Sequence, residues 1–299
     1  MKITISGASG FIGRRLLKTL TASGHSLQVL SRHSGMNMPA GVKVFPWNPA
    51  QSEPPADSLR DVDAVVHLAG EPVAQRWNEA VKARIRDSRV KGTENLVEAI
   101  AKLERKPAVL VCSSAIGYYG SRGDDVLTES SAKGDDFLAD VCASWESAAK
   151  KAEALGVRVV SVRTGHVLDP RGGLLKRILP PFRLGAGGRL GNGKQWMSWI
   201  HLEDMANLVQ FAVENPVSGA INGVSPDPVT NAGFTRALAG QLHRPAIFPV
   251  PKLALKLMFG EMADVIMGSQ RVLPKAAESA GFAFRFPELR PALENLFGK

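Results

Sequence analysis

The sequence predicts an α/β protein in which a doubly wound parallel sheet is joined to a smaller, mostly helical C-terminal lobe. Three observations support this fold class. In the first half, short apolar stretches that lack polar alternation are separated by segments of helix length, as expected for strands covered on both faces. Polar and glycine-rich motifs directly follow the predicted strands, where such sheets bind ligands. Beyond residue 170 the alternation stops, and a stretch rich in glycine, proline and arginine leads into helical segments.

These two patterns divide the 299-residue chain into two parts, and the chain crosses between them more than once. We assign residues 1–170 and 196–228 to the domain that contains the sheet, and residues 171–195 and 229–299 to a substrate lobe. With 44% hydrophobic and 22% charged residues, the composition is typical of a globular protein and excludes a disordered chain.

The expected elements follow one another along the chain. The first strand ends in a glycine turn, and the first helix carries an apolar stripe at Ile12, Leu16 and Leu20. We expect a helix over residues 139–153 and a single strand over residues 157–168. The other expected strands lie within 26–32, 63–70, 107–115, 199–201 and 219–230. The other expected helices are 93–104, 202–214, 233–243, 252–267 and 288–297.

The turn after the first strand carries the pattern G-x-x-G-x-x-G at Gly7, Gly10 and Gly13. Glycines here let the backbone approach a pyrophosphate, and the start of the following helix offers free N–H groups and the positive end of its dipole. The strand–turn–helix context therefore predicts a dinucleotide site and makes the domain one of the Rossmann type. The other residues of this turn that we expect at the cofactor are Ser9, Phe11 and Ile12.

The end of the second predicted strand favours NADP(H) over NAD(H). An acidic residue at this point normally accepts hydrogen bonds from the ribose and repels a 2′-phosphate. Here the stretch reads VLSRHSG and has no carboxylate. Ser31 offers a hydroxyl donor, and Arg32 offers a planar guanidinium that suits a phosphate. The alternative is that Arg32 is a solvated loop residue.

The charge balance and the apolar runs limit the partners of the protein. The formal net charge is +9, but the positive residues are spread along the chain and the densest run has no interleaved aromatic residues, so we expect no nucleic acid partner. No apolar run reaches the ~20 residues that a membrane span needs. A membrane-surface helix over residues 252–267 is disfavoured by its two acidic residues and its core-like apolar content, so we expect no membrane partner.

The two cysteines, Cys112 and Cys142, show no metal-ligand spacing and predict buried, reduced thiols. The N-terminus has no long apolar core of the kind found in signal peptides. We therefore expect a cytoplasmic protein with no metal site.

Several motifs carry a resemblance to a known family. The glycine turn is followed in order by HLAGEP, SSAIGYYG, FLADVCASWE, VRTGHVLDP, QWMSWIHLEDM and the tail GSQRVLPKAAESAGFAFRFPEL. In this order the chain resembles the extended, epimerase-like branch of the short-chain dehydrogenases/reductases. Over essentially its whole length it is similar to the atypical subgroup called epimerase family proteins. The resemblance implies a protein that binds NADP(H) and acts on an undefined small molecule.

The resemblance also implies roles for single residues. Arg89 would reach the cofactor from the next long helix, and Val167 would lie near the nicotinamide. The alternatives are a solvated helix face for Arg89 and ordinary packing for the apolar residues. The residues implied along the cofactor path are Leu68, Ala69, Gly70 and Glu71.

The catalytic signature of this superfamily, Tyr-x-x-x-Lys, is absent. Counting back from the strand LGVRVV places its two positions on Val141 and Trp145. In the superfamily a cation lowers the phenol pKa of about 10 and so allows proton transfer near neutrality, and an indole cannot serve as that cation. By resemblance, Ser114 takes the place of the catalytic serine and Tyr118 that of a tyrosine near the substrate. The alternative is that Ser114 caps a strand end and Tyr118 packs beside it.

Two interpretations of function follow. The first is an NADP(H)-dependent oxidoreductase or epimerase-like enzyme with Ser114 and Tyr118 as catalytic residues. Its substrate would be a carbonyl or hydroxyl compound, and a nucleotide-linked compound is one option. The second is a regulatory or scaffold protein that binds NADP(H) without turnover. The sequence leaves the substrate open, as well as the choice between monomer and homodimer.

Overall fold

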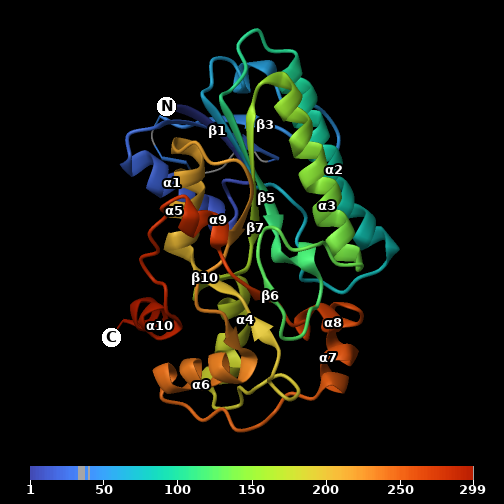
Figure 1. Cartoon of the computed structure of the whole chain (residues 1–299), viewed down its shortest axis with the longest axis vertical. Coiled ribbons are helices and arrows are strands. Elements are labelled where there is room, and N and C mark those ends of the chain that lie inside the picture. Colours follow the sequence, from blue (N-terminus) through green and yellow to red (C-terminus); the bar gives the residue numbers. More distant parts are fainter. Residues whose placement is uncertain (33–37, 40, 299) are drawn as a thin grey trace.

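The computed structural model describes residues 1–32, 38–39 and 41–298. Its upper part holds a large sheet with helices against it, and its lower part is the mostly helical lobe (Figure 1). The sheet has seven parallel strands in the order β11-β7-β5-β4-β1-β2-β3. Because the order reverses beside β1, the predicted doubly wound parallel sheet is confirmed. The strands are β1 (Lys2–Ser6), β2 (Ser26–Ser31), β3 (Lys43–Pro46), β4 (Ala64–His67), β5 (Val109–Ala115), β7 (Arg158–Thr164) and β11 (Gly219–Gly223).

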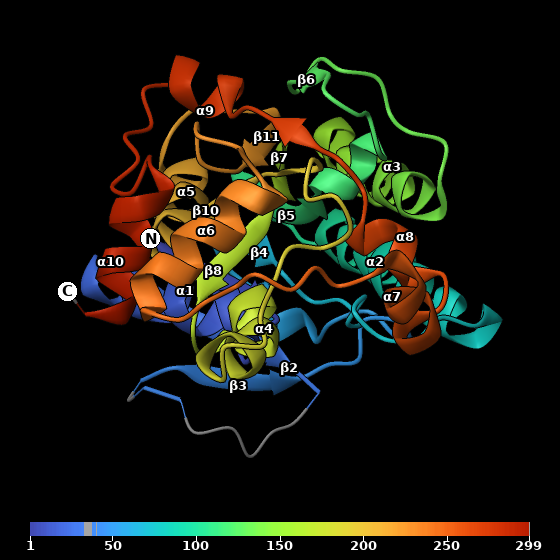
Figure 2. The same ribbon diagram turned by 90° about the horizontal axis from the view of Figure 1, so that it is seen from below.

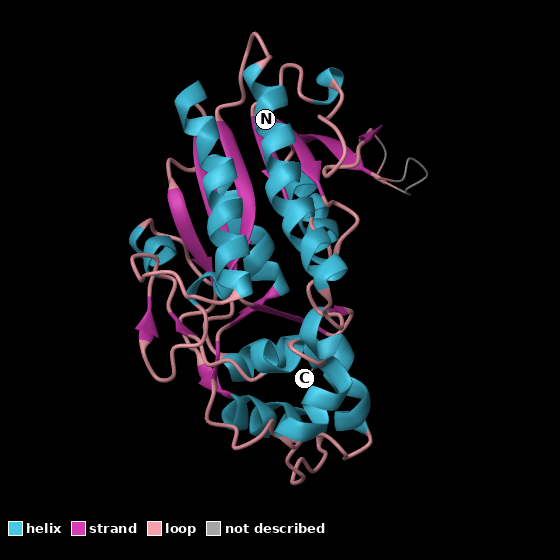
Figure 3. Cartoon of the chain, turned by 90° about the vertical axis from the view of Figure 1, so that its right-hand side faces the viewer, coloured by secondary structure: helices cyan, strands magenta, loops and turns pink. Residues whose placement is uncertain are grey.

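Helices cover both faces of this sheet. On one face α1 (Phe11–Ala22) packs beside α5 (Leu202–Glu214). On the other face α2 (Glu79–Ala101) packs beside α3 (Phe137–Lys150), and Figure 3 shows these helices running along the strands. The short 3-10 helices are η1 (Ala56–Ser58), η2 (Ile116–Tyr119) and η3 (Lys151–Leu155).

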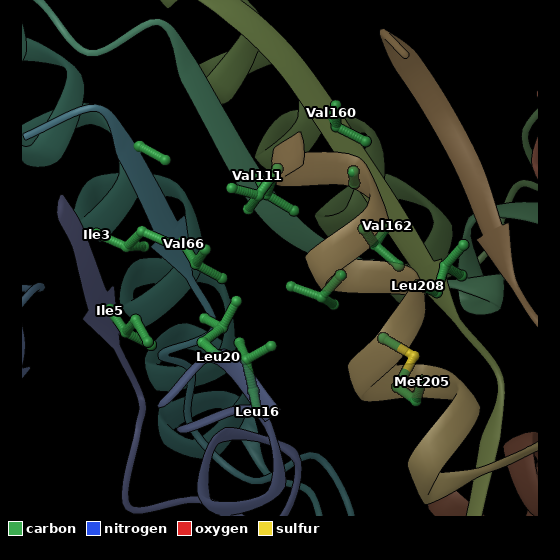
Figure 4. Packing of buried hydrophobic residues seen from close by; sticks show 14 of the residues in the cluster. Ile3, Ile5, Leu16, Leu20, Val66, Val111, Val160, Val162, Met205 and Leu208 are labelled. Atoms are coloured by element: carbon green, nitrogen blue, oxygen red, sulfur yellow. The ribbon is translucent and has the colours of Figure 1, made fainter. Parts of the chain in front are cut away.

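The larger core lies between the sheet and the pair α1 and α5. Ile3 and Ile5 of β1 meet Leu16 and Leu20 of α1, and all four are fully buried (Figure 4). Burying a side chain of this size contributes about 1.5–3 kcal/mol relative to leaving it exposed. The predicted apolar stripe of the first helix is therefore its buried face. Other members of this core, from β4, β5, β7 and α5, are Val66, Val111, Val160, Val162, Met205 and Leu208.

Several elements differ from the sequence-based expectation, among them the helix expected over residues 93–104, which is α2 and begins at Glu79. Residues 157–168 form two strands, because β7 ends at Thr164 and β8 (His166–Asp169) leaves the main sheet to pair with β10 (Trp199–His201). Residues 252–267 form two helices, α7 (Lys252–Phe259) and α8 (Met262–Ile266), because Gly260 between them has a φ of +61°. The edge strand β3 was not expected, since only two of its four residues are strongly apolar.

The lobe packs around its own apolar cluster. Its helices are α4 (Gly173–Arg183), α6 (Asn231–Leu242) and α10 (Leu289–Phe297), with α7 and α8 beside them. Figure 2 shows these helices from below. A two-stranded ladder of β9 (Trp196–Met197) and β12 (Val229–Thr230) connects α6 to the chain that returns from the lobe.

The C-terminal segment returns to the sheet before it ends. β13 (Arg271–Val272) pairs with β6 (Val126–Leu127), and α9 (Lys275–Ser279) packs against β11. The buried carboxylate of Asp204, at the start of α5, accepts hydrogen bonds from the backbone N–H groups of Arg285 and Phe286. This carboxylate therefore fixes the tail to the first turn of α5.

Candidate functional site

The glycine turn after β1 has the close packing that a nucleotide cradle needs. Gly7 has a φ of +72°, and a Cβ atom there would lie 2.7 Å from the carbonyl carbon of Leu68. A Cβ atom at Gly13 would lie 2.3 Å from the carbonyl oxygen of Gly7. Only glycine therefore lets β1, α1 and the end of β4 approach one another this closely.

The N-terminus of α1 faces this turn, and within the described residues no side chain caps its N–H donors. Its N-cap is Gly10, which provides no side-chain cap, and its first turn has no acidic residue. The free N–H groups and the positive end of the helix dipole favour an anion such as a pyrophosphate.

A cavity beside this turn brings together most of the predicted cofactor residues. From the predicted set it is lined by Gly7, Ser9, Gly10, Ser31, Arg32, Leu68, Ala69, Gly70 and Glu71. Residues that the sequence analysis missed also line it, namely Leu30, Trp47, Asn48, Pro49, Ala50, Pro72 and Ser88. Trp47 to Ala50 follow the unexpected strand β3, so identifying that strand would have pointed to them.

Five of the predicted cofactor residues lie outside the walls of this cavity, namely Arg89 and four others. The ring of Phe11 lies against Gly172 and Gly173, where a Cβ atom on Gly172 would be 2.3 Å from a ring carbon. Ile12 and Val167 pack with the core between the sheet and α1. Gly13, the fourth, acts through the close packing described above.

Arg89 is half-buried rather than solvated, so the solvated alternative was wrong. Its guanidinium donates to the backbone oxygens of Glu71 at 3.0 Å and Ile85 at 3.1 Å. The guanidinium carbon lies 5.1 Å from the ring centre of Trp145, and a Cβ atom on Gly70 would lie 3.1 Å from it. Burial lowers the pKa of this guanidinium. Arg89 therefore supports the loop that follows β4, and this loop lines the cavity.

His67 ends β4 next to the same cavity. Its Nδ1 is 2.6 Å from the hydroxyl of Ser6, and its ring centre is 5.8 Å from that of Trp47. Burial lowers the pKa of His67 to about 4, so the imidazole is neutral at physiological pH. This neutral ring joins the ends of β1, β3 and β4 beneath the nucleotide cradle.

A second polar cluster lies at the ends of β5 and β7. The hydroxyl of Ser114 donates to Oε1 of Glu146 at 2.6 Å. Arg163 holds the same carboxylate with two hydrogen bonds, from Nε and one terminal nitrogen, both of 2.8 Å. The sequence analysis missed Glu146 and Arg163, although a charged residue within the apolar strand VRVVSVRT was a signal for the latter.

Arg163 also contacts both tyrosines. Its guanidinium carbon lies 3.5 Å from the ring centre of Tyr118 and 5.1 Å from that of Tyr119, distances that permit cation–π attraction. It donates to the Tyr119 hydroxyl at 2.9 Å, and that hydroxyl donates to Asn222 at 2.7 Å. Burial raises the pKa of Tyr119 to about 12 although Arg163 opposes the shift. Tyr119 is therefore a protonated structural residue, and Tyr118 is the partly exposed tyrosine of the pair.

The structure corrects the positions that face Ser114 from the helix α3. Val141 and Trp145 turn away from the cluster, since Val141 packs with Val81 and Ile85 of α2, and the Trp145 indole donates to Thr93 at 2.9 Å. Leu138 and Cys142 of α3 lie against Gly117 of η2, and Glu146 is the α3 side chain that accepts the hydrogen bond from Ser114.

Neither Leu138 nor Cys142 replaces the missing pair. Burial raises the pKa of Cys142 to about 11, so its thiol stays protonated at neutral pH. A neutral thiol supplies neither the phenol nor the cation of the superfamily signature. The charged partners of this site are therefore Glu146 and Arg163.

The glycine turn, the uncapped helix start and the cavity fit a dinucleotide that lies across the carboxyl ends of the strands. The fold and this site together define a dinucleotide-binding protein of the short-chain dehydrogenase/reductase type. Residues 3–225 match the NAD dependent epimerase/dehydratase family, and the chain belongs to this family. Residues 250–296 match a domain of unknown function, DUF1731.

Relatives and solved structures agree with this assignment. An epimerase family protein of Mycobacterium tuberculosis is 43% identical over 97% of this chain and 96% of its own length. The structure of human epimerase family protein SDR39U1 with NADPH matches with a TM-score of 0.88 and 34% identity over 99% of both chains. A nucleoside-diphosphate sugar epimerase of Corynebacterium glutamicum matches with a TM-score of 0.81 and 35% identity, over all of this chain and 58% of that one. The resemblance to atypical epimerase family proteins is confirmed.

No helix within the described parts of the chain combines the length and apolar character that crossing a membrane requires.

Proposed function

We propose that the protein is an NADP(H)-dependent oxidoreductase or epimerase-like enzyme that acts on a carbonyl or hydroxyl group of a small molecule. The observation that carries this proposal is the placement of two sites at one edge of the sheet. The nucleotide cradle lies at the ends of β1, β2 and β4, and the cluster around Ser114 lies at the ends of β5 and β7.

The choice of NADP(H) rests on the end of β2. Ser31 and Arg32 line the cavity there, and no carboxylate stands at this strand end to repel a 2′-phosphate. The human relative was solved with NADPH, which agrees with this choice. Arg32 is the residue on which the preference depends.

In this proposal, Ser114 and Tyr118 position a substrate oxygen and move its proton. When bound, the nicotinamide supplies hydride exchange with the substrate carbon. The Ser114 hydroxyl donates its only proton to Glu146. In this arrangement Ser114 accepts a hydrogen bond from a substrate hydroxyl, and it donates to a carbonyl oxygen only when that proton turns away from Glu146. Tyr118, held against Arg163, offers a second hydroxyl to the same oxygen.

The cofactor assignment is tested by titrating the protein with NADPH and NADH while nicotinamide fluorescence is followed. We expect Arg32→Asp to weaken NADPH binding at least tenfold and to leave NADH binding unchanged or tighter. Arg60→Asp is the matched control, because Arg60 is exposed and pairs with Asp57 outside the cavity. Absence of binding by either dinucleotide would overturn the proposal.

Turnover is tested next, by following NADPH oxidation across a library of carbonyl compounds. We expect Ser114→Ala and Tyr118→Phe to lower the rate about 10²-fold while NADPH binding is retained. Glu153→Gln, an exposed change just beyond α3, should leave the rate unchanged.

A regulatory or scaffold protein that binds NADP(H) without turnover is the second candidate. The specific observation in its favour is that α3 presents a carboxylate to Ser114, that of Glu146, and no tyrosine or lysine of the superfamily signature. Tight NADPH binding together with no oxidation of NADPH by any compound in the library would select this candidate.

A further inference from the structure

Two segments of the lobe differ from the rest of the molecule in their charge. Residues 171–195 and 231–260 contain ten of the 37 lysines and arginines and none of the 28 acidic residues. The rest of the chain therefore holds 27 basic and 28 acidic residues, and the entire net charge of +9 arises from these two segments. A concentration of charge on one part of a surface attracts a partner of the opposite sign.

The same two segments expose large apolar side chains. Six of them are between 65% and 83% exposed, where an ordinary solvent-facing residue would be polar. We call these six side chains the apolar patch: Leu184, Ile247, Phe248, Leu253, Leu257 and Met258.

The patch lies on neighbouring stretches of chain. The segment that follows α4 runs beside the segment that precedes α7, because the backbone N–H of Val250 donates to Arg189 and the N–H of Gly191 donates to Val250. Pro245 also lies next to Gly185, beside Leu184. Figure 1 shows α6 and α7 at the lower end of the molecule, remote from β1 and β3. None of the six side chains of the patch lines the cavity of the nucleotide cradle.

Helix α7 departs from the sequence-based expectation of a core helix. Of its large apolar residues, Leu255 is buried, whereas Leu253 and Leu257 face solvent. The two acidic residues that follow α7 are paired, Glu261 with Lys82 of α2 and Asp264 with Lys252 and Lys256 of α7. Their charges are offset, and these two lysines of α7 add correspondingly less to the attraction of an anionic partner. Both reasons for rejecting a membrane-surface helix are thus removed.

We propose that this end of the lobe docks on a bilayer that contains anionic phospholipids. The apolar patch would enter the boundary between headgroups and acyl chains, and the basic residues around it would contact phosphate groups. Arg183 and Arg189, both exposed, flank Leu184 in the sequence and supply part of this charge.

The charge and the side-chain types of this surface favour an anionic bilayer over a second copy of the chain and over a nucleic acid. A second copy of the chain would bring one basic surface against another, which repulsion disfavours. A nucleic acid would satisfy the basic residues but not the patch, because five of its six side chains are aliphatic or thioether groups that cannot stack on bases as aromatic rings do. A bilayer satisfies both features.

Co-flotation of the full chain with lipid vesicles tests the proposal. We expect binding to vesicles of phosphatidylcholine with about 30% phosphatidylglycerol, and at least tenfold weaker binding to phosphatidylcholine alone, since each basic residue near an anionic surface adds to the attraction. Phe248→Ser with Leu257→Ser should lower binding at least tenfold, and so should Arg183→Glu with Arg189→Glu.

Two control variants change the same residue types elsewhere. Val126→Ser alters an exposed apolar residue of β6, and Lys18→Glu with Lys43→Glu alters exposed charges of α1 and β3. Both should bind vesicles as the unchanged protein does, and all variants should keep the same melting temperature and NADPH affinity.

Three results would overturn the proposal. One is no flotation with anionic vesicles. Another is a dimer in sedimentation that Phe248→Ser with Leu257→Ser dissociates, because the patch would then be an interface between copies. The third is binding to DNA or RNA that outcompetes the vesicles and is unaffected by that apolar variant.

Discussion

The cofactor half and the reaction half of the site are built in different ways. The nucleotide cradle is made by backbone geometry, with Gly7 and Gly13 so close to their neighbours that no Cβ atom fits. The cluster around Ser114 is made by side chains, with Glu146 held between a serine and an arginine. An added side-chain atom should therefore disrupt the cradle, whereas removal of one charged partner should disrupt the cluster around Ser114.

Removal of the Glu146 carboxylate should have the largest effect. In Glu146→Ala the guanidinium of Arg163, whose side chain is only 5% exposed, would stay buried without its partner. We expect the free energy of unfolding to fall by about 3–5 kcal/mol, measured by urea denaturation.

Two further variants sharpen this prediction. Glu153→Ala, an exposed change, should cost less than about 0.5 kcal/mol. Adding Arg163→Met to Glu146→Ala should recover much of the loss, because no unpaired charge would remain. A loss below about 1 kcal/mol in Glu146→Ala would show that charge does not govern this cluster.

An added methyl group in the cradle should have the next largest effect. In Gly13→Ala the new Cβ atom would start 2.3 Å from the Gly7 oxygen, so α1 must shift away from the turn. We expect a loss of about 3 kcal/mol in stability and at least tenfold weaker NADPH binding.

Gly240→Ala is the matched control for this change. Gly240 lies within α6, and a Cβ atom there would meet no atom within 4 Å. The substitution should raise stability by about 0.5–1 kcal/mol, because alanine favours a helix. If both variants behaved alike, close packing would not be the property that defines the cradle.

His67 lies buried beneath the nucleotide cradle, and its titration should make the stability of the protein depend on pH. The pKa of this buried imidazole is about 4 in the folded protein, against about 6.5 in an unfolded chain. Lowering the pH below 6.5 protonates the unfolded chain first, so stability is complete above that pH and falls until about pH 4. At pH 5 the loss due to His67 should be about 2 kcal/mol.

Urea denaturation at pH 7 and pH 5, with and without His67→Gln, measures this contribution. The difference between the two pH values should shrink by about 2 kcal/mol in the variant. The remaining pH dependence is expected, because burial also lowers the pKa of His201 to about 4. An unchanged difference would mean that His67 is not neutral in the folded protein.

The cofactor half could be predicted from the sequence because its signals are local. The glycines, the first strand and the first helix lie within 22 residues, and Ser31 and Arg32 follow the next strand directly. Trp47 was missed because the edge strand that it follows has a weak apolar pattern. The reaction half was predicted only in part, since Ser114 and Tyr118 were found without the partners that hold them.

The sequence by itself determined the alternation of strands and helices in the first half, the glycine turn of the cradle and the absence of the Tyr-x-x-x-Lys signature. Only the tertiary structure decided that Glu146 lies between Ser114 and Arg163, which are 32 residues before and 17 residues after it. It also decided that the outer face of α7 is uncovered. The physical reason is that periodicity shows which side chains share a face, whereas burial and pairing depend on segments that the fold brings from elsewhere in the chain.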